Sequence, residues 1–234
     1  MKFKALAILS AAALTACSDA PESPATGETT AIDSTAPDIT APAGEYRMDP
    51  SHATLVFRIL HMGLSHYTAG FSDFSATLDF DPAAPETMAV SAVINVRSLT
   101  IPNPPENFHD TLLGPDWLQT EDYPTITFTS TGVTQTGARS ATVEGELTLL
   151  GVTVPVTMEA DYVGGYPGFH PHDPQARISF SAHGTLDRAD FGMTQYLPTE
   201  NSPGALSNEI EFRIDAEFLG PPTPPEITEM DYNQ

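Results

Sequence analysis

Apolar and polar residues alternate with a period of two through most of the chain between residues 45 and 219. The clearest case is the segment EIEFRIDAEF at 209–218, where Ile210, Phe212 and Ile214 alternate with charged residues. Side chains two residues apart lie on the same face of a β-strand. The pattern therefore predicts a strand with one apolar and one charged face.

The same alternation recurs in seven other segments, which are separated by turn-forming residues such as Asp81-Pro82, Gly151 and Gly184. These segments are 53–61, 74–80, 88–96, 124–130, 141–150, 151–163 and 176–187. We therefore expect about eight antiparallel strands and an all-β fold. Only the stretch Pro104–Pro124 departs from this period, because Phe108, Leu112 and Leu113 follow helical spacing. It predicts a short helical excursion of one or two helices.

Eight alternating strands favour a closed antiparallel barrel or a sandwich, since closure removes exposed sheet edges. The expected inward positions are rich in Phe and Ile and poor in charge. Such a set fits a solid core, and it also fits an apolar cavity, since an eight-stranded barrel is wide enough to hold one ligand. The alternation alone does not distinguish a solid core from a cavity. Of the two we expect the solid core, because large apolar residues are most often buried in packed cores.

Both ends of the chain differ from this middle part. Residues 1–16 combine two lysines with a short apolar run, which is the layout of a secretory signal peptide. Leu14 to Cys17 resembles a bacterial lipobox, in which the cysteine becomes the lipid-bearing N-terminus. For residues 17–44 we expect a lipid attachment site followed by a disordered acidic linker. For residues 220–234 we expect a disordered Pro-rich tail.

The lipobox implies an exported protein of the bacterial cell envelope that is anchored to the membrane through Cys17. Because Ser18 rather than aspartate follows the cysteine, the resemblance implies the outer membrane, facing the periplasm. The chain has 31 acidic and nine basic residues and a formal net charge of -22. Such a charge repels phosphate backbones and excludes nucleic acid as a partner. No nucleophile elbow or phosphate loop is found, and we expect no enzyme.

The folded region resembles the YceI-like family of bacterial periplasmic proteins. The resemblance begins at YRMDPSHATLVFRILHMG, 46–63, is strongest at YPTITFTSTGV, 123–133, and continues through DRADFGM and LSNEIEFRIDAEF. It covers nearly all of residues 45–219. The segment NPPENFHDTLL departs from the family's usual polar motif, and only His109-Asp110 and the leucines match it. The resemblance therefore does not indicate which lipid head group this protein prefers.

The resemblance implies a lipocalin-like barrel that binds a long isoprenoid chain, such as a polyprenyl lipid or the tail of a quinone, in an apolar cavity. No cofactor is required, and a homodimer is compatible with the sequence. The ligand-binding candidates are the large apolar residues expected inside the barrel, together with residues that could mark its mouth. They are Phe57, Ile59, His61, Phe71, Phe74, Phe80, Ile94, Leu113, Trp117, Phe128, Leu147, Phe180, Phe191, Tyr196 and Phe212.

Two alternatives remain open. His170, His172 and Asp173 lie within four residues and offer ligands for Zn²⁺ or Cu²⁺ if a further ligand converges on them. The prolines at 171 and 174 fit a rigid loop without metal equally well. The second alternative is a stress-related structural or interaction barrel without a ligand, since barrels carry many functions.

Overall fold

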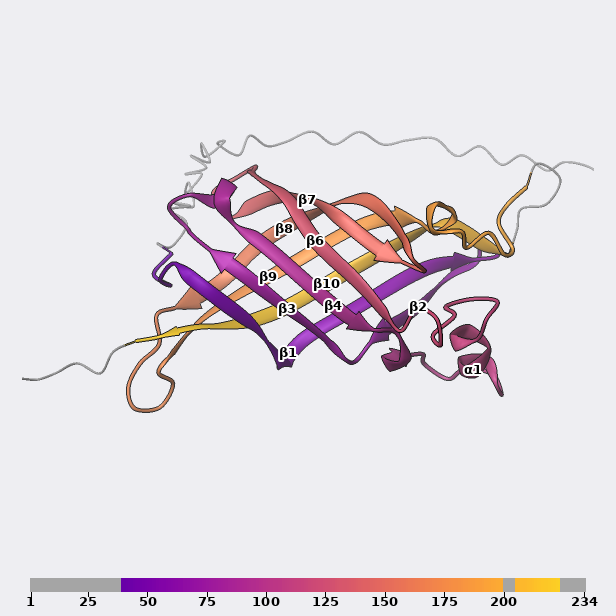
Figure 1. Ribbon diagram of the computed structural model, residues 1–234, viewed down its shortest axis with the longest axis horizontal. Helices are drawn as coiled ribbons and strands as arrows, with labels where there is room; N and C mark the ends of the chain where they lie inside the picture. Colours follow the sequence, from indigo (N-terminus) through magenta and orange to yellow (C-terminus); the bar gives the residue numbers. More distant parts are fainter. Residues whose placement is uncertain (1–38, 200–204, 224–234) are drawn as a thin grey trace, which may run out of the picture. The chain divides into compact units, whose positions relative to one another are not determined.

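Eight strands form a closed antiparallel barrel in the computed structural model, which describes residues 39–199 and 205–223 (Figure 1). They are β1 (Gly44–His61), β3 (Phe74–Phe80), β4 (Ala89–Asn95), β6 (Thr125–Gln135), β7 (Ser140–Leu149), β8 (Val152–Tyr166), β9 (Gln175–Asp187) and β10 (Leu206–Pro222). Pairing of β1 with β10 closes the circle. The all-β prediction is confirmed, and these strands correspond to the eight segments that alternate in the sequence.

β1 changes partners along its length. Its first residues, Gly44–Arg47, pair with β3, whereas Leu55–His61 pair with β2 (Ser65–Phe71). The short β5 (Leu99–Thr100) continues this extension beyond β2. Neither β2 nor β5 was among the predicted strands. Gly70 allows β1 and β2 to approach closely, since a Cβ there would lie 2.5 Å from the carbonyl oxygen of Leu55.

The expected helical excursion is confirmed as a single short helix, α1 (Phe108–Leu113), at one end of the barrel (Figure 1). Three 3-10 turns accompany the strands: η1 (Pro85–Thr87), η2 (Val96–Ser98) and η3 (Arg188–Phe191). η3 lies in the connection between β9 and β10. No helix in the part of the chain that the structure describes is long and apolar enough to cross a membrane.

The folded part extends beyond the expected limits of 45 and 219 on both sides. Ala41 is only 2% exposed, and the carbonyl of Pro42 accepts a 2.7 Å hydrogen bond from the hydroxyl of Tyr46. Strand β10 continues to Pro222. The predicted signal peptide, Cys17 and most of the predicted linker and tail lie outside the described residues.

Side chains pack tightly at the end of the barrel where β1 begins. Tyr46 is fully buried, and burial, with a smaller contribution from Tyr162, raises the pKa of its hydroxyl to about 12. Its ring meets that of Phe80 edge to face at 5.4 Å. A Cβ at Gly220 would lie 2.1 Å from this ring, so β10 needs a glycine there.

Candidate functional site

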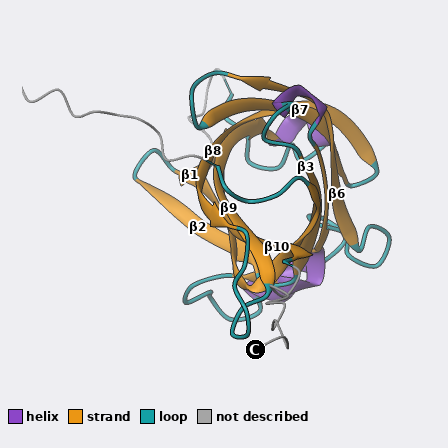
Figure 2. Cartoon of the chain, turned by 90° about the vertical axis from the view of Figure 1, so that its left-hand side faces the viewer, coloured by secondary structure: helices purple, strands orange, loops and turns teal. Residues whose placement is uncertain are grey.

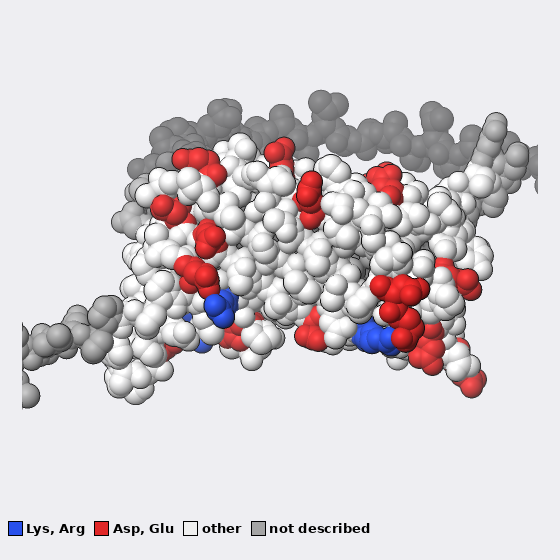
Figure 3. Space-filling model, viewed as in Figure 1, with Lys and Arg blue, Asp and Glu red and all other residues white. Residues whose placement is uncertain are grey.

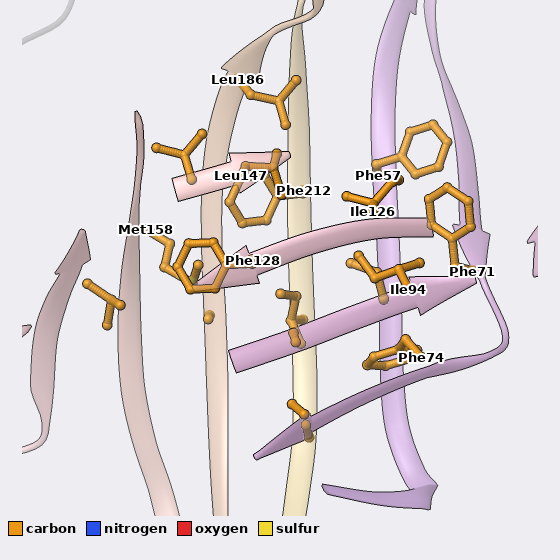
Figure 4. A pocket seen from close by; sticks show the side chains of 18 of the residues that line it. Phe57, Phe71, Phe74, Ile94, Ile126, Phe128, Leu147, Met158, Leu186 and Phe212 are labelled. Carbon is orange, nitrogen blue, oxygen red and sulfur yellow. The ribbon is translucent and has the colours of Figure 1, made fainter. Parts of the chain in front are cut away.

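An apolar cavity of about 870 Å³ occupies the interior of the barrel. It reaches from the β6–β7 turn, where Ala138 and Arg139 line it, to the opposite end, where Trp117 and Tyr196 line it. Figure 2 looks along the barrel from the first of these ends, and Figure 4 shows aromatic and aliphatic side chains from several strands around the space. The barrel is therefore hollow, although the alternation alone favoured a solid core.

The inward faces predicted from the alternation form the wall. On β10 these are Ile210, Phe212, Ile214, Ala216 and Phe218, all of which line the cavity. Thirteen of the fifteen candidate residues also line it. They are Phe57, Ile59, His61, Phe71, Phe74, Phe80, Ile94, Trp117, Phe128, Leu147, Phe180, Tyr196 and Phe212. The structure thus gathers most of the predicted set around one space.

Leu113 and Phe191 are the two candidates that do not line the cavity. On α1, Phe108 and Leu112 face the cavity, and Leu113 points elsewhere because successive residues of a helix are rotated by about 100°. Phe191 lies in η3 and is 2% exposed, but it packs against Val96, Leu149 and neighbouring residues. It belongs to a core cluster beside the cavity, which includes wall residues such as Leu149 and Met193, but Phe191 itself does not line the space.

Several wall residues were missed by the sequence reasoning. Ile126, Met158 and Leu186 lie on strands already predicted, at positions that continue the alternation, so the signal was present. Tyr67 lies on the unpredicted β2. Arg139 and Arg188 lie in connections between strands, where no periodic pattern shows which way a side chain points.

Most polar side chains on the wall lie near its two ends. At the α1 end, the Trp117 and Tyr196 rings stack at 6.2 Å, and Tyr196 remains 66% exposed. Tyr67 meets Phe108 edge to face at 6.3 Å, and its buried hydroxyl has no hydrogen-bond partner among the described residues. The middle of the wall is apolar. This arrangement suits an elongated apolar ligand whose polar group stays near one end.

The predicted histidine loop does not bring three metal ligands together. His170 forms a 2.7 Å hydrogen bond with the carbonyl of Thr223. The carboxylate of Asp173 accepts hydrogen bonds from Tyr166 at 2.7 Å and Arg177 at 2.9 Å, which hold its pKa below the usual value. His170, His172 and Asp173 are not among the described groups whose ligand atoms converge.

Asp49, His52 and Glu217 are the one described group with three converging ligand atoms. A cation already lies among them: Nη1 of Arg177 is 3.1 Å from Asp49 and 3.2 Å from Glu217. His52 and the backbone N–H of Ser51 each lie 2.9 Å from the Asp49 carboxylate. These contacts hold a bulge of β1 against β9 and β10, and the group is an ion-pair cluster rather than a metal centre.

The Asp49 cluster predicts a specific dependence of stability on pH. The hydrogen bonds from His52, Ser51 and Arg177 lower the pKa of Asp49 to about 2. Because this pKa is lower in the folded than in the unfolded protein, the stabilisation is complete above about pH 4 and is lost toward pH 2. We expect Asp49→Asn to lower the free energy of unfolding by about 1–2 kcal/mol at pH 7. Urea titrations at pH 7 and pH 3 should show this difference shrinking at the lower pH.

Asp79→Asn is the matched control, because Asp79 is exposed on β3 and forms no ion pair among the described residues. It should leave the urea midpoint nearly unchanged at both values of pH. An Asp49→Asn deficit that stays constant between pH 7 and pH 3 would contradict the assignment.

Comparison with solved structures reveals the same fold in proteins of low sequence identity. BcnA of Burkholderia cenocepacia superposes with a TM-score of 0.61 at 21% identity, covering 73% of this chain and 98% of BcnA. A domain from Saccharophagus degradans described as polyisoprenoid-binding superposes with a TM-score of 0.53 at 13% identity, covering 77% of this chain and all of that domain. At these identities the likeness concerns the fold.

Sequence comparison extends the likeness to the family. A UPF0312 protein of Pseudomonas putida strain W619 is 35% identical over 179 residues, which cover 76% of this chain and 87% of that protein. Protein YceI of Escherichia coli O157:H7 is 36% identical with the same coverage. The model of the YceI-like domain matches residues 46–218, which comprise the whole barrel except its outermost residues. The chain therefore belongs to the YceI-like family.

Proposed function

We propose that this protein binds a long-chain isoprenoid lipid in the barrel and sequesters or carries it. The observation that carries the proposal is the cavity of about 870 Å³, whose wall is apolar over nearly its whole length. A polar or charged small molecule would lose its hydration in such a space without gaining hydrogen bonds. A polyprenyl chain or the tail of a quinone forms no hydrogen bonds with water, so it loses none when it enters the cavity.

The binding energy would come from removal of the tail from water. Each 100 Å² of apolar surface buried contributes about 2.5 kcal/mol, so a tail that fills the cavity gains enough to offset its loss of freedom. Aromatic side chains such as Phe57, Phe74 and Phe128 supply much of this surface. No chemical step is needed, and we propose binding rather than catalysis. The polyisoprenoid-binding description of the structurally similar Saccharophagus domain supports this choice of ligand.

We also propose that the protein is an exported lipoprotein of the bacterial cell envelope, anchored through Cys17. The signal-like residues 1–16 and the lipobox-like Leu14–Cys17 support this part of the proposal. An anchor with a long acidic linker would hold the barrel beside a membrane, where isoprenoid lipids reside. The outer membrane is the expected location because of Ser18.

Organic extraction of the purified protein followed by mass spectrometry tests the proposed ligand. The full chain is expressed in a bacterium that makes isoprenoid lipids, purified in mild detergent and extracted. We expect a prenyl lipid or a quinone in near-stoichiometric amount, because release of the tail into water is unfavourable. An extract without such a lipid, combined with no binding of added farnesol, would overturn the proposal.

Cys17→Ala separates the anchor from the cavity. This variant should leave the membrane fraction and yet yield the same lipid on extraction, since residue 17 lies far along the chain from every wall residue. Retention of the variant in the membrane would contradict anchoring through Cys17, and loss of the lipid would contradict independent roles for anchor and barrel.

A further inference from the structure

The arginines of the described chain divide into two groups according to whether they line the cavity. Five of them lie away from it, and each contacts a carboxylate. The pairs are Arg47–Glu45, Arg58–Glu211, Arg97–Glu121, Arg213–Asp215 and Arg177 with Asp49, Asp173 and Glu217. Figure 3 shows this on one face, where the few basic side chains lie beside acidic ones. In so acidic a chain, an arginine without a carboxylate partner is the exception.

Arg139 and Arg188 are the two exceptions, and both line the cavity. Among the described residues, neither forms an ion pair. Arg188 is 1% exposed, and it donates hydrogen bonds to the carbonyls of Met193, Ser207 and Leu206 at 2.7, 2.8 and 3.3 Å. Its guanidinium is thus held by backbone dipoles near the α1 end and is committed to the fold.

Arg139 lies near the other end of the cavity, and its charge is far less compensated. Its guanidinium makes one contact of 3.3 Å, from Nη2 to the carbonyl of Val163. Its guanidinium carbon lies 5.2 Å from the centre of the Tyr162 ring, and its buried Nε has no acceptor among the described residues. Stacking on an aromatic face leaves the remaining N–H groups available, in the arrangement that arginine uses to bind phosphate or carboxylate.

The backbone around Arg139 is well fixed. In the β6–β7 turn, the carbonyl of Ser140 accepts hydrogen bonds from the N–H groups of Thr136 and Gly137 at 2.9 and 3.1 Å. The carbonyl of Arg139 itself accepts a 2.7 Å hydrogen bond from the backbone N–H of Tyr162. The turn and β8 together therefore hold the guanidinium at this end of the apolar wall, before any ligand binds.

We propose that Arg139 binds the anionic head group of a lipid whose tail lies in the barrel. This inference rests on the proposed function and narrows its ligand class to lipids that carry a phosphate or carboxylate, in preference to uncharged quinones or alcohols. It also sets the direction of the ligand, with the head at the β6–β7 turn and the tail pointing toward Trp117 and α1. Among the wall residues that the structure describes, Arg139 is the one arginine whose hydrogen-bond donors are not all taken up by protein oxygens, so a negative charge placed there gains a free partner.

Isothermal titration of the full chain with farnesyl phosphate and with farnesol tests the assignment. The two ligands share one tail and differ only in the charged head. We expect the wild type to bind the phosphate at least about tenfold more tightly, the effect of a charge-assisted hydrogen bond in a partly buried site. Arg139→Gln should remove this preference by weakening the binding of farnesyl phosphate at least about tenfold more than that of farnesol. Arg139→Lys should retain part of the preference.

Arg47→Gln is the matched control, since it removes one positive charge from the outer surface near the same end of the barrel. It should leave the preference intact. Equal affinities of the wild type for both ligands, or an unchanged preference in Arg139→Gln, would overturn the head-group assignment while lipid binding stands. Failure of both ligands to bind would instead overturn the proposed function, and the head-group assignment with it.

Discussion

Replacing Ala92 by tryptophan should prevent long-chain lipids from occupying the barrel while leaving the barrel folded. Ala92 lies in the middle of β4, lines the cavity, and pairs across the sheet with Ala76 on one side and Phe128 on the other. An indole at this point projects into space that the structure leaves open. Overpacking normally costs about 1–3 kcal/mol in a filled core, and here the open cavity reduces that cost.

The expected loss of affinity follows from the area that the indole denies to the tail. About 100 Å² of lost burial corresponds to about 2.5 kcal/mol, which is between tenfold and a hundredfold in affinity. Titration with prenyl alcohols of increasing length measures it. Geraniol should still bind in one half of the divided cavity, whereas geranylgeraniol should lose most of its affinity.

Ser91→Trp provides the control for this experiment. Ser91 is the preceding residue of β4 and is exposed on the outer face, so the same bulk is added outside the barrel. It should bind both alcohols as the wild type does. If Ala92→Trp remains folded and still binds geranylgeraniol with wild-type affinity, the tail does not pass through the middle of the barrel.

The strands could be predicted because their information is local. On β10 and β1, a period of two places every second residue on the inner face, regardless of which strands pair with them. The inward faces of these strands were therefore identified correctly. β2 was missed because the segment 65–71 contains Gly70 and begins beside a turn, and because its place in the sheet depends on the far half of β1. Two-residue β5 carries no detectable pattern.

The hollow interior could not be predicted from alternation. Whether Phe57 and Phe128 meet across the barrel or face open space depends on the number and tilt of the strands, which set the radius. A filled and a hollow barrel therefore share the same pattern of inward residues. The family resemblance, rather than the pattern, indicated the cavity.

The roles of the arginines are also set by tertiary structure. Arg139 and Arg188 lie outside the alternating segments, and the sequence does not distinguish them from other charged residues in connections between strands. Arg188 in particular lies close to Asp187 and Asp190 in the sequence. In the fold Arg188 instead turns to backbone carbonyls and is buried. Burial lowers its pKa from the usual value for arginine, although the group remains a cation.

Replacing Arg188 by methionine should strongly destabilise the barrel. Methionine matches much of the length of the side chain but leaves the carbonyls of Met193, Leu206 and Ser207 without their donor. Each buried acceptor without a partner costs about 1–3 kcal/mol, and local relaxation recovers part of the sum. We expect the free energy of unfolding to fall by about 3–5 kcal/mol, measured as a lower urea midpoint.

The matched comparison is Arg213→Met, which removes an exposed arginine paired with Asp215 on the outer face of β10. Because exposed ion pairs contribute about 0–1 kcal/mol, its midpoint should stay close to that of the wild type. Arg188→Lys should lie between the two, since one ammonium cannot reach all three carbonyls in the geometry of a guanidinium. A wild-type midpoint for Arg188→Met would show that these carbonyls find other donors. The η3 connection would then be held by its apolar contacts, such as those of Phe191, rather than by the buried cation.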